Sequence, residues 1–402
     1  MRVRVGMSNR LLEIKLYHLK LPFRQSFAHA QKRRESTETV VGAALLADGT
    51  VGYGEGLPRR YVTGETAASV MYNVGDALAG PLRGLEPKSF CELLEVVDAL
   101  PFRNEQGDVI NAARCCVELA LLDAYGRYFG SDLSSIVQWM GYGGFGGVGS
   151  LEGIRVSGVL GASRAAKTDK LLRAMRWYGL RDFKLKLGTQ YDEELLGLVE
   201  RRLGRGMRRE RLTLRVDANG AWDIDTAVGM SERLAGMGVC SLEQPLAAED
   251  GGHLQALADL SEVPLMADES LLTYEDGEYL AEHDLVDYFN IRVSKNGGLL
   301  PAIRLAEIAT RYDKGYQLGA MVGETAILTT AGMQFLRMVP RVVFTEIGYS
   351  TFLLEEDLGV SRVRFGYRGR LRPLAGPGLG VSVRQDRLGR FLLGSPRTIE
   401  LG

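Results

Sequence analysis

The second half of the chain alternates short apolar segments with amphipathic helical patterns, such as those at residues 192–203 and 299–312. We predict eight strands there, at 155–160, 183–187, 212–217, 239–245, 265–268, 288–293, 316–321 and 342–346. Strands that alternate with helices form right-handed parallel βαβ units. The pattern therefore predicts an α/β fold, a closed (β/α) barrel over residues 155–350, with an open doubly wound sheet as the alternative.

The first 140 residues follow a different pattern. Residues 39–46 and 51–54 are strand-like and are joined by the turn Ala47-Asp48-Gly49, which predicts a hairpin. Residues 109–122 are too densely apolar for a surface helix and predict a buried one. We divide the chain into an α+β domain at 1–140, a glycine-rich linker at 141–154, the barrel at 155–350, and a C-terminal segment at 351–402.

Composition and charge narrow the classes of function. The 402 residues include 49 Lys and Arg and 50 Asp and Glu, so the net charge of −1 attracts neither nucleic acid nor an anionic membrane. No apolar run approaches the roughly 18 residues that cross a bilayer, and the first residues lack an apolar signal segment. We therefore expect a cytoplasmic protein that acts on a small molecule, with no nucleic-acid or membrane partner, and we expect it to form a homo-oligomer.

Charged residues stand at the ends of most of the predicted strands. The C-terminal ends of barrel strands meet at the mouth, where active sites of this architecture lie. Alternate side chains of a strand face opposite ways, so two lysines two positions apart point together into the lumen. Of the adjacent carboxylates at 268 and 269, the regular spacing favours the first as the inward one. The predicted inward residues are Lys184, Lys186, Asp217, Glu243, Asp268 and Lys295.

Three inward carboxylates repel one another unless a cation lies among them. Ligation by oxygen alone, without His or Cys, suits magnesium or manganese better than zinc. Lys186 and Lys295 come from the second and sixth predicted strands, so they approach the cavity from opposite sides. Two amines that flank one carbon, beside a cation that can hold a carboxylate, are suited to removing the proton next to that carboxylate. Either lysine can be the base.

Taken together, these residues resemble the enolase superfamily and, within it, the muconate lactonizing enzyme subgroup. The motifs that carry the resemblance are Lys184-Leu185-Lys186, Val216-Asp217-Ala218-Asn219, Leu242-Glu243-Gln244-Pro245, Asp268-Glu269-Ser270, Lys295-Asn296-Gly297-Gly298, Gly52-Tyr53-Gly54-Glu55-Gly56 and Gly376-Pro377-Gly378-Leu379-Gly380. The resemblance implies a modified (β/α)8 TIM barrel, with an α+β N-terminal capping domain that the C-terminal segment completes.

The resemblance also assigns roles to single residues. It implies magnesium ligands at Asp217, Glu243 and Asp268. It implies that Lys186 and Lys295 are the acid/base pair. It implies that Lys184 stabilises the substrate carboxylate or the enolate.

The resemblance is less specific about the substrate. The mandelate racemase subgroup has a catalytic His late in the barrel, whereas no His follows His283 in this chain. Dipeptide epimerases often carry Asp-x-Asp at the eighth strand, where this chain reads Thr345-Glu346-Ile347-Gly348, which is similar to cycloisomerases. At the seventh strand the acidic residue, Glu324, is shifted by one position from the cycloisomerase motif, so its role stays open.

Two N-terminal loops are similar to those that close over the barrel mouth in this family. Their residues Arg24, Arg59, Arg60 and Tyr61 are candidates for contact with the distal part of the substrate. Two or more arginines would suit a second carboxylate. The other predicted substrate-binding residues are Asn219, Glu269, Glu324 and Glu346.

The sequence therefore predicts a magnesium-dependent isomerase that abstracts the proton α to a substrate carboxylate, by cycloisomerisation or by racemisation or epimerisation. A dehydrating lyase of the o-succinylbenzoate synthase type would use the same lysines and metal and is the first alternative. The alternative from another class is a noncatalytic protein that binds carboxylates through a metal. It is disfavoured because binding requires a cation but not two opposed bases.

Overall fold

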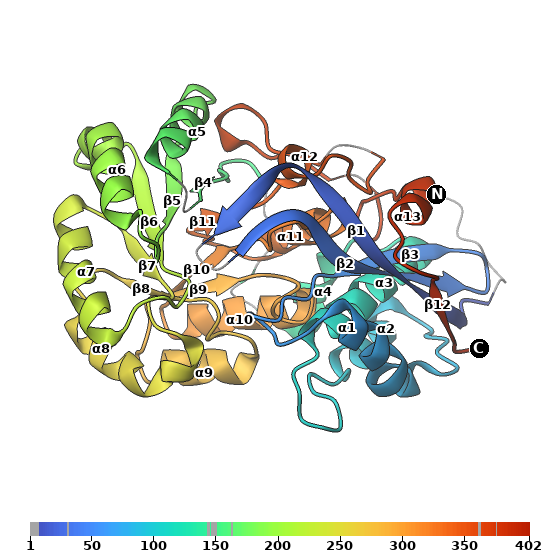
Figure 1. Cartoon of the computed structure of the whole chain (residues 1–402). Helices are drawn as coiled ribbons and strands as arrows, with labels where there is room; N and C mark the ends of the chain where they lie inside the picture. The colour runs from blue at the N-terminus through green and yellow to red at the C-terminus, as the bar shows by residue number, and fades with distance from the viewer. Residues whose placement is uncertain are drawn as a thin grey trace.

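Two sheets organise the protein, a small antiparallel one and a closed parallel barrel (Figure 1). The computed structural model describes residues 8–29, 32–142, 145, 151–161, 164–360, 363–374 and 376–402. The predicted linker lies partly outside these residues, and the predicted domain boundaries stay predictions. In the described part of the chain, no helix is long and apolar enough to cross a membrane.

The antiparallel sheet has the strand order β12-β1-β2-β3. Its strands are β1 (Leu11–His29), β2 (Lys32–Leu46), β3 (Val51–Gly56) and β12 (Arg397–Glu400). The predicted hairpin is confirmed, because β2 pairs with β3 across the turn at Ala47 to Gly49. The last strand of the chain pairs with the first, Ile399 facing Ile14. The C-terminal segment thus completes the N-terminal domain, as the family resemblance implies.

The buried helix predicted in this domain is α3 (Asn111–Phe129), in which every residue from 111 to 126 is buried. It packs on β3 at unusually close range. A Cβ atom added at Gly52 would lie 2.0 Å from the Ala124 nitrogen, and one added at Gly54 would lie 2.0 Å from the Cys116 carbonyl oxygen. Glycine is therefore required at both positions for the helix to approach the strand. The domain's other helices are α1 (Ala67–Asn73), α2 (Phe90–Asp98) and α4 (Ser135–Met140).

The second sheet contains eight parallel strands among the described residues, in sequence order from β4 to β11. They are β4 (Gly158–Leu160), β5 (Asp182–Lys186), β6 (Thr213–Asp217), β7 (Ser241–Glu243), β8 (Leu265–Ala267), β9 (Tyr288–Ile291), β10 (Gly315–Leu318) and β11 (Phe344–Thr345). Next to β4, Val156 forms a parallel bridge with Thr345, and Ser157 N donates to Thr345 O at 2.8 Å. The sheet therefore closes on itself, and the predicted barrel is confirmed over the open alternative.

Helices follow the barrel strands and pack around them (Figure 1). They are α5 (Ala165–Trp177), α6 (Asp192–Met207), α7 (Ile224–Met237), α8 (Leu254–Leu260), α9 (Tyr274–Glu282), α10 (Leu299–Arg311), α11 (Ala326–Met338) and α12 (Ser350–Leu353). The last of these has only four residues. A short helix, α13 (Gln385–Arg390), precedes the final strand.

The antiparallel domain contacts the barrel at several points. Phe23 of β1 forms a bridge with Leu354, directly after α12. Glu55 of β3 is fully buried and accepts hydrogen bonds from the Thr325 hydroxyl at 2.7 Å and from Leu328 N at 3.2 Å, at the start of α11. Burial raises the pKa of Glu55 to about 7, although these donors oppose the shift. This carboxyl group joins the two parts of the molecule.

Replacing Glu55 by Ala should therefore destabilise the whole protein. The change leaves the Thr325 hydroxyl, Thr325 N and Leu328 N buried without the carboxylate that accepts from them. Each such group costs about 1 to 3 kcal/mol, so we expect the free energy of unfolding to fall by about 3 to 5 kcal/mol. Urea denaturation measures this loss, and Glu105→Ala, at an exposed site, is the control with an effect of about 0.5 kcal/mol or less. Equal losses in the two variants would contradict the assignment.

Candidate active site

The predicted inward residues converge at the C-terminal ends of the barrel strands. Lys184 and Lys186 lie on β5, and the carboxylates of Asp217 and Glu243 end β6 and β7. Asp268 follows β8 directly. All three carboxylate side chains and Lys295 are completely buried, and the two β5 lysines are nearly so. Buried charges are costly unless they are paired, and here the lysines pair with the carboxylates.

The two β5 lysines pair with the carboxylates of the neighbouring strands. Lys184 Nζ lies 3.1 Å from Glu243 Oε1, 3.6 Å from Asp217 Oδ2 and 2.8 Å from Glu346 Oε2. Lys186 Nζ donates to Asp217 Oδ2 and to Asn219 Oδ1, both at 2.8 Å. Lys184 therefore lies deep in the barrel among three carboxylates, whereas Lys186 lies nearer the mouth beside Asn219.

Lys295 approaches from the other side of the ring. It lies in the turn after β9, a strand four places from β5 in the order of the eight-stranded sheet. Lys295 Nζ donates to the Asp268 backbone carbonyl at 2.6 Å, to Asp268 Oδ1 at 3.0 Å and to the Asn290 carbonyl at 2.8 Å. Lys186 and Lys295 thus contact opposite ends of the row of carboxylates formed by Asp217, Glu243 and Asp268.

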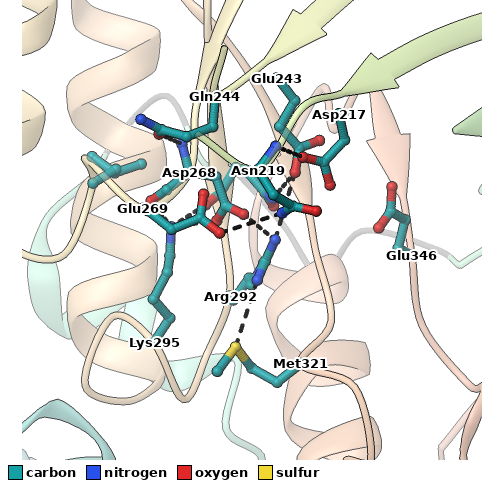
Figure 2. A network of polar contacts seen from close by, with 12 residues as sticks. Asp217, Asn219, Glu243, Gln244, Asp268, Glu269, Arg292, Lys295, Met321 and Glu346 are labelled. Atoms are coloured by element: carbon teal, nitrogen blue, oxygen red, sulfur yellow. Dashed lines mark hydrogen bonds and ion pairs between the residues drawn. The ribbon is translucent and has the colours of Figure 1, made fainter. Parts of the chain in front are cut away.

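Arg292 is a central residue that the sequence analysis missed. Its guanidinium forms an ion pair with Asp268 and lies 3.5 Å from Glu243 Oε1, and it donates to Met321 Sδ at 3.6 Å. Figure 2 shows this side chain in the middle of the labelled carboxylates. Along β9 and at the residue directly after it, the apolar residues Phe289 and Ile291 alternate with Asn290 and Arg292. That alternation was the signal that Arg292 faces inward.

The same alternation places other missed polar residues in the lumen. On β6, Arg215 lies two positions before Asp217, and it donates to Glu346 Oε1 at 2.7 Å. Gln317 of β10 and Asn290 of β9 donate to the two oxygens of Glu243 at 3.2 and 2.8 Å. Gln317 and Asn290 therefore hold the Glu243 carboxylate in place, and Arg215 holds that of Glu346.

Burial and neighbouring charges shift the pKa values of the residues in this cluster in different directions. Burial lowers the pKa of Lys295, and Arg292 adds to that effect against the attraction of Asp268. Burial would also lower the pKa of Lys184, but its carboxylate neighbours outweigh burial and raise it. Burial raises the pKa of Glu243 to about 7 and that of Glu269 to about 8. Lys184 therefore remains a cation, whereas burial favours the neutral amine of Lys295.

The donor set fits a hard divalent cation. Asp217, Glu243 and Asp268 supply buried carboxylate oxygens from three adjacent strands, the ligand type that magnesium and manganese prefer. Oε2 of the neighbouring Glu269 is buried without a hydrogen bond from any described residue. Among the described residues, no three such side chains are close enough together to hold a metal ion. The Arg292 guanidinium instead lies between Asp268 and Glu243. Here Arg292 and Lys184 supply the positive charge that these carboxylates require.

A cavity of about 500 Å³ opens above the cluster. Lys184, Lys186 and Arg292 line it, as do four of the predicted substrate-binding residues, Asn219, Glu269, Glu324 and Glu346, together with Tyr61. The other three are not among the described residues that line it. Arg24 donates to the Glu355 carbonyl at 2.9 Å, and Arg60 is exposed. Arg59 is buried, and its guanidinium donates to Thr37 Oγ1 and to the Val322 carbonyl, both at 2.7 Å.

Glu324, whose role the sequence left open, lies on the wall of this cavity and accepts a hydrogen bond from Met321 N at 2.6 Å. Burial raises its pKa to about 8, and the nearby Glu55 adds to the shift. A carboxyl group with a raised pKa in the folded state binds a proton on folding, so its contribution to stability falls as pH rises from about 4.5 to about 8.

Glu324→Gln should remove this dependence, because the amide does not titrate and its oxygen can still accept from Met321 N. Relative to the unchanged protein, we expect the variant to gain about 3 kcal/mol of stability between pH 5 and pH 8. Thermal unfolding of both proteins across this range measures the gain. Two parallel profiles would show that Glu324 is already ionised at pH 5.

A closed parallel barrel with opposed lysines and clustered carboxylates at its mouth defines a class of barrel enzyme, and comparison with known proteins specifies the family. The family described as Enolase C-terminal domain-like matches residues 167–387. Muconate cycloisomerase 1-2 of Acinetobacter lwoffii is 30% identical over 86% of this chain and 86% of that protein. The chain belongs to the enolase superfamily, in the branch that contains muconate cycloisomerases and their related racemases and epimerases.

Other relatives agree with this placement. N-succinyl-L-Arg/Lys racemase of Bacillus cereus is 24% identical over 94% of this chain and 97% of that protein. The crystal structure of muconate lactonizing enzyme from Pseudomonas fluorescens superposes with a TM-score of 0.81, at 27% identity, over 96% of this chain and 100% of that one. The chain is thus an enzyme of this superfamily, and its racemase and cycloisomerase relatives are isomerases.

Proposed function

We propose that the protein is a magnesium-dependent isomerase that removes the proton α to a substrate carboxylate and returns a proton to the resulting enolate. One observation carries the proposal. Lys186 lies at the end of β5 and Lys295 follows β9, four places away in the ring, and each contacts a different end of the row of three buried carboxylates. A substrate carbon held over that row has an amine on either side.

The metal would be held by Asp217, Glu243 and Asp268. When bound, magnesium supplies positive charge that stabilises the enolate form of a substrate carboxylate. Lys184, which stays charged among its carboxylates, adds positive charge at the inner end of the site. Arg292 would exchange part of its contact with Glu243 and Asp268 for contact with the substrate carboxylate, because a guanidinium binds carboxylates in the same way.

The two lysines move the proton. One lysine, as the neutral amine, takes the α proton, and the electron pair of that C–H bond passes into the enolate. The other lysine, as the ammonium, gives a proton to the opposite face, which inverts the carbon. A low pKa favours the neutral form, so the burial of Lys295 beside Arg292 suits it to the first task. Transfer in the reverse direction exchanges the two roles.

The experiment that tests the proposal follows solvent deuterium into substrates. The purified protein with Mg²⁺ in D₂O is incubated with a panel of dicarboxylates, N-acyl amino acids and dipeptides, and NMR detects loss of the α-proton signal. We expect exchange and isomerisation for at least one class, both dependent on the metal. Binding of carboxylates without exchange anywhere in the panel would support the noncatalytic alternative instead.

A dehydrating lyase is distinguished from an isomerase by its product. Such an enzyme releases water and forms a new double bond, so the product mass falls by that of one water molecule, whereas isomerisation leaves the mass unchanged. Mass spectrometry of the reaction mixture therefore distinguishes the two activities. The related proteins include racemases, epimerases and cycloisomerases, which favours isomerisation.

A further inference from the structure

The cavity above the two β5 lysines does not end at the barrel mouth. It continues outward between α5 and the segment that follows β11, two parts of the chain that lie next to each other in Figure 1. We call this extension the apolar chamber. It is lined by Leu171, Met175 and Tyr178 on the α5 side and by Tyr349, Phe352 and Phe365 on the other side. The chamber shares one continuous cavity with Lys184 and Lys186, whereas Lys295 lies buried beside it, against Asp268.

Aromatic rings build the far wall of the apolar chamber around Phe365. The Phe365 ring centroid lies 5.1 Å from that of Phe352, 5.3 Å from that of Tyr349 and 6.2 Å from that of Tyr178. Gly348 allows this arrangement, because a Cβ added there would lie 3.2 Å from the Phe365 nitrogen, and its φ is +77°. The glycine lets the backbone of Phe365 pack close, which brings the ring into the wall.

Charge is distributed unevenly along the cavity. Its charged lining residues, within the described part of the chain, all belong to the barrel mouth and lumen: Lys184, Lys186, Glu269, Arg292, Glu324 and Glu346. The described lining of the apolar chamber contributes no charged side chain. A charged group placed there would lose its hydration without gaining a partner, whereas an apolar group would lose only unfavourable contact with water.

The arginines predicted to hold a second substrate carboxylate do not supply this missing charge. Arg59 binds the Thr37 hydroxyl and the Val322 carbonyl, and Arg24 binds the Glu355 carbonyl. The rim of the apolar chamber is instead apolar and open, with Trp177 84% exposed and Phe352 45% exposed. An apolar ligand that lies in the chamber would cover this surface.

From these observations we propose that the apolar chamber holds the tail of the substrate, and that the substrate class is a monocarboxylate with a long aliphatic or aromatic substituent. This inference rests on the proposed function, because it assumes that the carboxylate end of the ligand lies at the lysines. It predicts discrimination against substrates whose distal end carries a second carboxylate or an ammonium group.

A series of N-acyl alanines tests the substrate class. The acyl group lengthens from acetyl through butanoyl and hexanoyl to octanoyl, and N-succinyl alanine is the charged counterpart. We expect kcat/KM for α-proton exchange to rise about threefold to fourfold for each added methylene until the apolar chamber is full. N-succinyl alanine should react more slowly than N-butanoyl alanine. A flat series, or preference for the succinyl compound, would overturn the proposal.

Substitutions test whether the dependence of kcat/KM on acyl chain length arises in the apolar chamber. Leu171→Arg introduces a charge into its wall and should lower kcat/KM for the octanoyl substrate at least tenfold, with less than a twofold change for the acetyl substrate. Leu260→Arg is the matched control, since Leu260 is an exposed leucine outside the cavity lining. Met175→Trp reduces the volume and should shift the optimum to a shorter chain. Equal effects on all chain lengths would overturn the assignment.

Binding measurements separate failure of this inference from failure of the proposed function. If no compound exchanges its α proton, the proposed function fails. Calorimetric titration with N-octanoyl and N-succinyl alanine then tests the apolar chamber alone, and tighter binding of the octanoyl compound that Leu171→Arg abolishes would support it. If Leu171→Arg instead changes the oligomeric mass and leaves the chain-length dependence intact, this surface is an interface between copies and the proposal is wrong.

Discussion

Replacing Lys186 or Lys295 by Ala should lower kcat for isomerisation by about 10³-fold, because proton transfer by a positioned side chain contributes roughly 10²- to 10⁴-fold. The two variants should not be equivalent in stereochemistry. Each retains one lysine on one face, so each can still exchange the α proton of one enantiomer without inverting it. Measurement of exchange and inversion separately, by NMR and chiral chromatography, is therefore more informative than rate alone.

The structure also sets the controls for this experiment. Lys170→Ala, at an exposed position of α5, removes a lysine without touching the cluster and should leave both rates unchanged. Lys295→Ala removes the donor to the Asp268 and Asn290 carbonyls, so thermal unfolding must show that the variant is folded. Exchange that persists at full rate in both alanine variants would refute the roles proposed for the two lysines.

Replacing Glu243 by Gln should weaken magnesium binding by about 100-fold or more. The change keeps the size of the side chain but removes one of the negative charges that a hard divalent cation requires. The row of carboxylates would then retain two charges, while Lys184 and Arg292 still contribute theirs beside it. The excess positive charge opposes entry of the metal in addition to the lost ligand.

Calorimetric titration with Mg²⁺ measures this affinity directly, and the rise in melting temperature on adding Mg²⁺ gives a second readout that does not depend on activity. Glu262→Gln, at an exposed site, is the matched control and should bind magnesium as the unchanged protein does. An unaltered affinity in Glu243→Gln would place the metal elsewhere, and the proposed mechanism would then lose its source of enolate stabilisation.

Local patterns predicted much of this architecture. The alternation of strands and helices indicated the barrel, and the position of each charge at a strand end indicated which side chains meet at the mouth. Both inferences depend on short-range regularities, namely the two-residue period of a strand and the length of one βα unit. Lys184 accordingly forms ion pairs with both Asp217 and Glu243.

Contacts between segments far apart in the chain could not be predicted from these local patterns. The sequence predicts that Arg59 faces the substrate, but its guanidinium binds Thr37 and the backbone of Val322. Arg292 was missed, although the alternation along β9 indicated an inward side chain. A pattern of polar residues shows which side chains need partners, but not which partner each will find, because that choice depends on packing across elements far apart in the chain.

The sequence by itself thus determined the ring of strands and the residues that face its centre, since apolar residues alternate along the strands with the polar residues that face the lumen. Only the tertiary structure decided the pairing of those charges and the shape of the space above them. The apolar chamber joins Leu171 of α5 to Phe365, which is nearly two hundred residues later. No local pattern specifies such a surface, because it forms only when the barrel closes and brings its first helix beside the segment that follows its last strand.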